Sequence, residues 1–231
     1  MSIDLRLEHR GDDVAFHDLA AEWNDLVAAS PSASLFLRQE WLAAWWDVFG
    51  AEFDQHLLLV RDGGGALLGA APLMTGRGPG RLRGRLKHLM FVGQQGETLA
   101  EHLDVLVRPG AEDDVVPLLA RGLRERTGRW DVLLLERVPT ASPTLPAFEV
   151  ALRALGLEVE RVNEQPSPYL PLPGAWDALL AAKSRNFRKQ WRNSVNRLAA
   201  EGEVRLLLAG RDVGLAEAFE RLVALHRARW G

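Results

Sequence analysis

The order of strand-like and helix-like segments constrains the fold of this chain more than any other feature. A short alternating segment at 3–9 is followed by two amphipathic segments, at 13–29 and 38–50. Alternation of apolar and polar residues is typical of a half-buried strand, whereas apolar residues spaced by three or four are typical of a helix. Extended segments then follow one another before the next helix begins. A doubly wound nucleotide-binding sheet would alternate strand and helix from its start, so the order disfavours that fold.

The extended segments begin with a hairpin, in which 56–62 and 66–74 flank the glycines at 63–65. Strands and helices alternate in the part of the chain that follows. We expect strands at 85–93, 101–110, 130–139 and 157–164, and helices at 112–128 and 143–157. The pattern therefore predicts an α/β (α+β) domain over residues 1–165.

A proline-rich segment, PSPYLPLPGAW at 166–176, follows this domain. We expect it to be extended, because proline fixes one backbone angle and has no N–H. A helix at 176–200, a strand at 203–210 and a helix at 212–231 come next. This order predicts the opening of a second unit of the same kind, which we expect to be incomplete over residues 166–231.

The two parts of the chain differ in charge. Residues 1–165 contain 17 Lys and Arg against 25 Asp and Glu, a net charge of −8, whereas residues 166–231 contain 11 against 6, a net charge of +5. Such an asymmetry indicates different roles for the two parts. The chain has no cysteine, which excludes disulfides and fits a reducing compartment. Since no secretory signal and no membrane-spanning segment is visible, we expect a cytoplasmic protein.

Several sequence blocks occur in an order that resembles one family. They are SLFLRQEWLAAWWDVFG, HLLLVRDGGGALLGAAPL, LMFVG, HLDVLVRPG, WDVLLLERVP, PYLPLPGAWDALLAAKSRNFRKQWRNSVNRL and LHRARW. Together with the order of elements, they resemble the CelD/BcsL-type branch of the GNAT superfamily of acyltransferases, which is associated with cellulose and exopolysaccharide biosynthesis. Members of this branch are built like the FemABX proteins, from two GNAT-like units in tandem. The resemblance implies a mixed sheet flanked by helices, followed by the start of a second GNAT-like unit.

The resemblance also implies an activity. The reaction would be direct transfer of an acyl group from acetyl-CoA or another acyl-CoA to an amine or hydroxyl of a small-molecule or glycan acceptor, without a metal. The family's chain continues beyond LHRARW, so we expect the residues that bind the acyl-CoA to lie beyond Gly231. Two alternatives stay open. The FemABX relation allows an aminoacyl-tRNA donor, and the chain could also act as a non-catalytic interaction module.

The first unit has a poor loop for a diphosphate. In GNAT enzymes the loop after the fourth strand reads roughly Q/R-x-x-G-x-G/A, and its backbone N–H groups hold the pyrophosphate at a helix N-terminus. The equivalent segment here is RPGAEDD at 108–114. Arg108 and Gly110 suit the role, but Pro109 has no N–H and three carboxylates follow at 112–114. We expect a capped helix in a degenerate unit rather than a CoA site.

Two residues are candidates for general base. Asp104 lies within an apolar segment, where a carboxylate is costly unless it has a partner, and it is a candidate for the substrate pocket. His102 shares a strand face with it if 101–110 is a strand, but no third ligand follows, so we expect no metal site. His226, near the end of the last expected helix, is the second candidate. Arg229 and Trp230 follow on the same helical face and are candidates for binding the substrate.

The segment KSRNFRKQWRNSVNRL at 183–198 contains six basic residues and no acid. On a helix, an apolar stripe would gather Leu180, Ser184, Phe187, Trp191, Val195 and Leu198. Because both aromatic rings lie on this stripe, we expect them to pack rather than stack on bases, and we expect no DNA partner. A second stripe holds four candidates for binding an anionic ligand: Arg185, Arg188, Lys189 and Arg192. A solvated basic face is the alternative for this stripe.

Overall fold

The computed structural model describes residues 4–12, 14–77, 86–95, 100–125, 129–162 and 164–231. The chain divides into two compact units, residues 1–163 and 164–231. The division falls two residues before the boundary expected from the sequence. No helix in the described ranges is long and apolar enough to cross a membrane.

A mixed sheet forms the centre of the first unit, with the strand order β1-β2-β3-β4-β6 and with β5 paired to β3. The strands are β1 (Leu5–Arg10), β2 (Asp54–Asp62), β3 (Leu67–Arg77), β4 (Lys87–Phe91), β5 (Leu106–Val107) and β6 (Val132–Leu133). Neighbours from β1 to β4 are antiparallel, and β6 runs parallel to β4. The expected mixed α/β architecture is therefore confirmed for this unit.

Strand β3 pairs with β2 along one edge, so its two other partner strands, β4 and β5, share the opposite edge. Leu73–Arg77 of β3 pair with β4, whereas Gly69 and Ala70 pair with β5. The chain leaves the sheet after Val92, whose N–H still bonds to Pro72 of β3, and returns as β5. The edge of β3 is thus shared by two strands with a long excursion of the chain between them.

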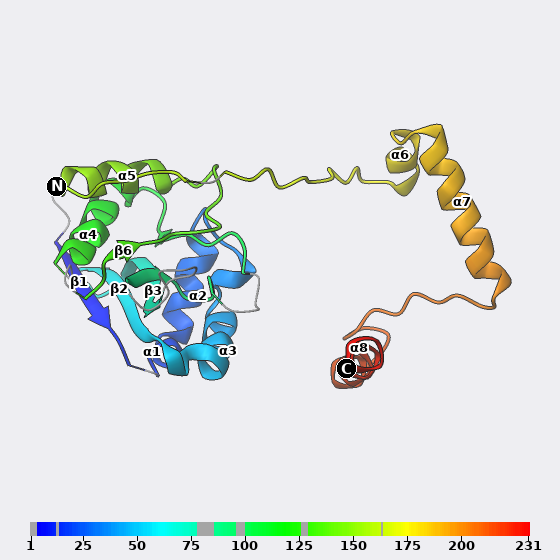
Figure 1. The fold of residues 1–231 in the computed structure, drawn as a ribbon, viewed down its shortest axis with the longest axis horizontal. Helices are drawn as coiled ribbons and strands as arrows, with labels where there is room; N and C mark the ends of the chain where they lie inside the picture. Colours follow the sequence, from blue (N-terminus) through cyan, green and yellow to red (C-terminus); the bar gives the residue numbers. More distant parts are fainter. Residues whose placement is uncertain (1–3, 13, 78–85, 96–99, 126–128, 163) are drawn as a thin grey trace. The chain divides into compact units, whose positions relative to one another are not determined.

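Helices cover both faces of this sheet. They are α1 (Ala15–Asp18), α2 (Ala20–Ala29), α3 (Gln39–Phe49), α4 (Glu112–Arg124) and α5 (Leu145–Ala154). In Figure 1, α4 and α5 lie at the upper left of this unit and α1 and α3 at its bottom, with the strands between them. On the α4 side, Gly122 lies directly against Leu7 of β1, which leaves no space there for a larger side chain. The ring of Trp45 on α3 contacts that of Phe53, at the start of β2, with centroids 5.7 Å apart.

The core of this unit is made of apolar side chains from both helical layers and the sheet. Trp23 of α2 is fully buried, and its indole N–H donates to the carbonyl oxygen of Leu37 at 2.8 Å. This bond satisfies the ring's polar atom, as a buried tryptophan requires. The core thus ties the first two helical segments to the strands.

Three expected strands are shorter or absent in this unit. Only Leu106–Val107 of 101–110 and Val132–Leu133 of 130–139 form strands, and 157–162 forms none. Leu157 instead donates its backbone N–H to Leu152 of α5, and Arg161 pairs with Glu149 of the same helix. The segment after α5 is therefore held against the helix at Leu157 and Arg161.

The second unit contains three helices, α6 (Trp176–Ala181), α7 (Arg185–Ala200) and α8 (Leu215–Trp230). The single helix expected at 176–200 is interrupted, because Ser184 caps the start of α7. The Ser184 hydroxyl oxygen accepts from the N–H of Phe187 at 3.2 Å, which is the usual arrangement of an N-cap serine.

The strands expected in the second unit, at 166–176 and 203–210, are absent from residues 164–231, all of which the structure describes. Proline removes N–H groups from the first segment. In the second, the N–H of Leu208 bonds to the Asp212 carboxylate and that of Gly210 to Val213, which closes a turn. No residue of this unit is buried, and residues 164–231 contain no strand with which either segment could pair.

Candidate functional site

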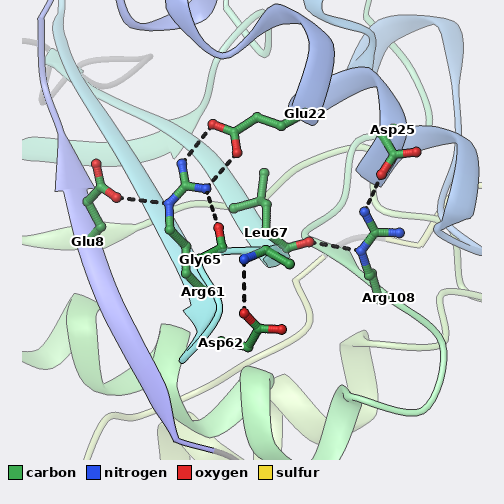
Figure 2. Close-up of polar contacts among 9 residues, drawn as sticks. Glu8, Glu22, Asp25, Arg61, Asp62, Gly65, Leu67 and Arg108 are labelled. Atoms are coloured by element: carbon green, nitrogen blue, oxygen red, sulfur yellow. Dashed lines mark hydrogen bonds and ion pairs between the residues drawn. The ribbon is translucent and has the colours of Figure 1, made fainter.

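The loop between β5 and α4 corresponds to the segment 108–114, which was compared above with the diphosphate loop of GNAT enzymes. Arg108 begins this loop. Its Nε donates to the carbonyl oxygen of Leu67 at 2.9 Å, and its Nη2 pairs with the carboxylate of Asp25 on α2 (Figure 2). The guanidinium therefore joins the loop to β3 and α2.

The backbone donors of the same loop are also engaged. The N–H of Gly110 donates to Glu112 Oε2 at 2.7 Å, and Pro109 has no N–H to offer. Asp113 and Asp114 add two more carboxylates to the first turn of α4. Negative charge at a helix N-terminus stabilises the helix but repels a bound anion. The Glu112 carboxylate thus holds the loop ahead of α4, although no side chain caps the helix at Ala111, and the three carboxylates do not fit the diphosphate of an acyl-CoA.

A second polar cluster, next to this loop, surrounds Arg61 of β2 (Figure 2). Its guanidinium donates two hydrogen bonds to Glu22 of α2, at 2.5 and 2.7 Å, and one to Glu8 of β1 at 3.0 Å. These bonds hold the pKa of the Glu22 carboxyl below its ordinary value and raise that of Arg61. The cluster links two strands to a helix, and its groups are engaged with one another. The sequence signal for it is an arginine at the end of the apolar run of β2, where a charge needs a partner.

Asp104, one of the two candidate bases, is 4 % exposed. Its Oδ1 accepts from Thr144 Oγ1 at 2.7 Å and from the N–H of Val105 at 2.8 Å, and its Oδ2 accepts from Ser32 Oγ at 2.7 Å. Both oxygens therefore have partners, from segments on three parts of the chain. This arrangement favours a role in holding the segment just before β5 in place.

His102 lies outside any strand and is exposed, while Asp104 is buried. The premise that the two share a strand face is wrong, because 101–105 is not paired in the sheet. The φ of His102 is 54°, in the left-handed region that few non-glycine residues adopt. Within the described ranges, no group of three His, Cys, Asp or Glu side chains could hold a metal ion.

Gln94 is a buried polar residue that the sequence did not single out. It is 6 % exposed. Its Oε1 accepts from the N–H of Phe91 at 3.3 Å and of Glu136 at 3.1 Å, and its Nε2 donates to the carbonyl of Leu134 at 2.9 Å. The side chain thus replaces a backbone ladder between the ends of β4 and β6. The adjacent Gly93 has φ of 85°, and a Cβ there would meet the ring of Trp41 at 2.5 Å.

A chain of polar side chains crosses the sheet on its α4 side. His9 Nε2 lies 3.1 Å from His56 Nδ1, and His56 Nε2 lies 3.1 Å from Thr75 Oγ1. Thr75 in turn donates to Asp54 at 3.4 Å. These residues come from three neighbouring strands, and only their register, which the sequence does not show, brings them together.

The basic residues of α7 separate into two groups. Arg188 Nη1 donates to the carbonyl oxygens of Ala181 and Lys183, at 3.2 and 2.5 Å, and Arg192 Nε donates to that of Arg188 at 3.2 Å. Arg188 therefore also caps the end of α6. In the described part of the chain, Arg185 and Lys189 have neither an acidic partner nor a hydrogen bond from the side chain.

His226, Arg229 and Trp230 are exposed on α8. The guanidinium carbon of Arg229 lies 4.8 Å from the centroid of the Trp230 ring, which is the geometry of a cation–π contact. His226 and Asp104 belong to different units. Asp104 is thus buried within the first unit, whereas His226 is exposed on a helix of the second.

No protein-family pattern and no curated protein matches this chain. Two solved structures are similar in fold. One is an aminoglycoside N-acetyltransferase, AAC(6')-Iy, in complex with CoA, with 13 % identity and a TM-score of 0.43, over 72 % of this chain and 97 % of the other. The second is glucosamine-6-phosphate N-acetyltransferase from Arabidopsis thaliana, with 13 % identity and a TM-score of 0.36, over 72 % of this chain and 99 % of the other. At these scores the likeness is a weak one.

Proposed function

We propose that this chain is a GNAT-type protein of the CelD/BcsL-like branch, which serves acyl transfer from an acyl-CoA to an amine or hydroxyl in cell-envelope or polysaccharide synthesis. The observation that carries the proposal is the order of elements in the first unit. One strand, three helical segments, an antiparallel set of strands, helix α4 and a parallel β6 follow one another. This order agrees with the family that the sequence blocks resemble.

The two units have different parts in this proposal. The first unit is a scaffold, because the donors of its 108–112 loop are engaged within the protein. The second unit carries His226 as the general base, with Arg229 and Trp230 beside it for the acceptor. Asp104 positions the segment just before β5, since three donors already occupy its oxygens.

The chemistry needs one proton acceptor. The nitrogen or oxygen of the acceptor attacks the carbonyl carbon of the thioester, and its proton passes to the imidazole of His226. The bond from the carbonyl carbon to the acceptor forms, and the carbon–sulfur bond breaks. CoA leaves as a thiolate and takes up a proton. Backbone N–H groups that polarise the thioester carbonyl would lower the barrier.

Release of the CoA thiol tests this proposal. A protein that includes the residues expected beyond Gly231 would be incubated with acetyl-CoA and a panel of amino sugars, because an amino sugar offers both an amine and hydroxyl groups as acceptors. We expect release that depends on the acceptor, is lost in His226→Ala, and persists in His17→Ala, a control at an exposed histidine of the first unit. Loss of a general base typically costs about 100-fold or more in rate. Release that is equal in both variants would assign the base elsewhere.

A non-catalytic interaction module is the second candidate. It is favoured by the occupied donors of the 108–112 loop and by the lack of any buried residue in the second unit. Titration calorimetry with acetyl-CoA, on a protein that includes the residues expected beyond Gly231, separates the two candidates. Absence of both binding and thiol release would support the module and overturn the enzymatic proposal.

A further inference from the structure

Helix α7 lies within the longest stretch of the second unit that contains cations without acids. Between Asp177 and Glu201 there are six Lys and Arg and no Asp or Glu. A protein surface normally intersperses both signs. The segment therefore presents a local positive field that its own helix does not neutralise.

The hydrogen bonds of the helix leave this field in place. Arg188 and Arg192 donate to backbone carbonyl oxygens, which carry no formal charge. Because a guanidinium has five N–H groups, each of these side chains keeps donors for a further partner. The cations of α7 are thus held close to the helix but remain available to an anion.

An apolar stripe runs along the same helix. It consists of Phe187, Trp191, Val195 and Leu198, which are spaced by four, four and three residues and are 40 to 55 % exposed. At a rise of 1.5 Å per residue the stripe is roughly 16 Å long. The Trp176 ring contacts the Trp191 ring edge to face, with centroids 5.1 Å apart, and adds a second indole at one end. Trp191 thus packs on a ring of its own unit, and both aromatic side chains of α7 stay 40 to 44 % exposed.

The cations of α7 differ in their position around the helix axis. At about 100° per residue, Arg188 and Arg192 lie roughly 65° and 105° from the centre of the apolar stripe, both on the same side of it. On the same scale, Arg185 and Lys189 lie roughly 125° and 165° from that centre, towards the opposite side of the helix. A surface that receives the stripe would thus meet Arg188 and Arg192 first.

The partner of α7 has to be both anionic and apolar to match this surface. We propose that α7 lies on an anionic phospholipid surface, with the apolar stripe at the level of the upper acyl chains and with Arg188 and Arg192 on the phosphates. Interfacial helices combine a low overall apolar content, a polar face rich in Lys and Arg, and a narrow face of Trp, Phe and Leu. Helix α7 has all three. The site is peripheral, as none of the described helices could span the bilayer.

The apolar half of the surface favours lipid over RNA. Single-stranded RNA needs cations and flat rings on which bases stack. Val195 and Leu198 offer no such ring, and they continue the stripe beyond the aromatic residues. Acyl chains, in contrast, accept aliphatic and aromatic side chains alike, and indoles prefer the interfacial level of the bilayer. The inference does not depend on the proposed acyltransferase activity.

Flotation of the full chain with vesicles tests the proposal. We expect flotation with phosphatidylcholine vesicles that contain phosphatidylglycerol, and none with phosphatidylcholine alone. The double variant Arg188→Gln/Arg192→Gln should weaken binding roughly 30-fold, since each basic residue near an anionic surface contributes about 1 kcal/mol. Phe187→Ser/Leu198→Ser should weaken vesicle binding by about tenfold or more, because the apolar area that α7 would bury in the bilayer is lost.

The matched control is Arg185→Gln/Lys189→Gln, which removes the same number of charges from the side of α7 away from the stripe. It should weaken binding less than Arg188→Gln/Arg192→Gln, because Lys189 lies on the face of α7 opposite the stripe, roughly a helix diameter from the phosphates, where salt screens its charge. Circular dichroism checks that each variant folds, which matters most for Arg188 because it caps α6. An equal loss in both charge variants would mean attraction by net charge alone and would overturn the proposal.

Two other outcomes would assign the surface to a different partner and overturn the proposal as well. Binding to transfer RNA that needs the four cations but tolerates Phe187→Ser/Leu198→Ser, with no flotation, would assign the surface to RNA. A concentration-dependent dimer that is lost in Phe187→Ser/Leu198→Ser, again without flotation, would assign it to a second copy of the chain.

Discussion

Trp23 and Trp191 show how differently the two units use the same kind of residue. Both lie on helices with an apolar stripe, and both have an aromatic neighbour at 5 to 6 Å. Trp23 is fully buried beneath α2 and donates its indole proton to Leu37, whereas Trp191 is 40 % exposed. Helical periodicity therefore predicts which residues share a face, but the presence of a second layer decides whether that face becomes a core.

The largest difference between the two units should appear when each of these tryptophan rings is removed in turn. Trp23→Ala deletes a fully buried side chain and leaves a cavity, which should cost about 4 kcal/mol of unfolding free energy. Trp191→Ala removes an exposed ring and should change stability by about 0.5 kcal/mol or less. Urea unfolding followed by circular dichroism measures both. Equal losses of unfolding free energy would show that Trp191 is as tightly packed as Trp23, which would contradict the comparison.

Substitution of one aspartate in each unit extends the comparison to polar sites. Asp104→Ala removes the acceptor of Ser32, Thr144 and a backbone N–H inside the first unit. Buried donors left without a partner cost about 1–3 kcal/mol, so we expect a loss of about 2 kcal/mol. Asp212→Ala removes an acceptor from the turn at Leu208 in the second unit, where water can replace it. Thermal melts of the two variants should differ clearly in Tm, and a larger drop for Asp212→Ala would contradict the comparison.

The smallest effect concerns ion pairs and pH. Arg61 lowers the folded-state pKa of Glu22 below its ordinary value of 4.5 by donating two hydrogen bonds. A depressed carboxyl pKa stabilises the fold at pH values above the ordinary pKa, and this contribution is lost as the pH falls through the folded-state value. Glu22→Gln should therefore cost about 1 kcal/mol near neutral pH, since Glu22 is partly exposed, and the difference from the parent should close in acid.

The control for this prediction is Glu203→Gln in the second unit. Its pKa is also lowered by a neighbouring arginine, Arg205, but both side chains are largely exposed. Unfolding curves at several pH values should show no measurable effect of this variant. A pH-independent loss in Glu22→Gln would mean that packing, and not charge, links Glu22 to Arg61.

In the first unit, the sequence correctly predicted the elements whose pairing or packing follows from local periodicity. The hairpin of β2 and β3 and the helices α3 and α4 are of this kind. The segment 101–110 alternates like a strand, yet only Leu106 and Val107 pair, because Leu103 donates instead to Arg137. Such a long-range hydrogen bond has no local signature, and the same is true of the bonds of Gln94.

In the second unit the sequence placed the helices better than the strands. The break at Ser184 is invisible to periodicity, since the apolar stripe continues through it, although a serine ahead of a helical segment is an N-cap signal. The basic residues were identified as a group. Their division into Arg188 and Arg192, which bond to carbonyls, and Arg185 and Lys189, which do not, depends on side-chain geometry that spacing alone does not give.

The sharing of one β3 edge by β4 and β5 has a thermodynamic consequence. The entropy cost of closing the loop between β4 and β5 rises only with the logarithm of its length, so residues can be added to it at little cost in stability. The two residue pairs of β5 are too few to define its register by themselves. Asp104 supplies what the short ladder lacks, because its two hydroxyl partners lie 72 and 40 residues away in the chain. The length of this loop is thus free to vary, whereas the position of its last turn is not.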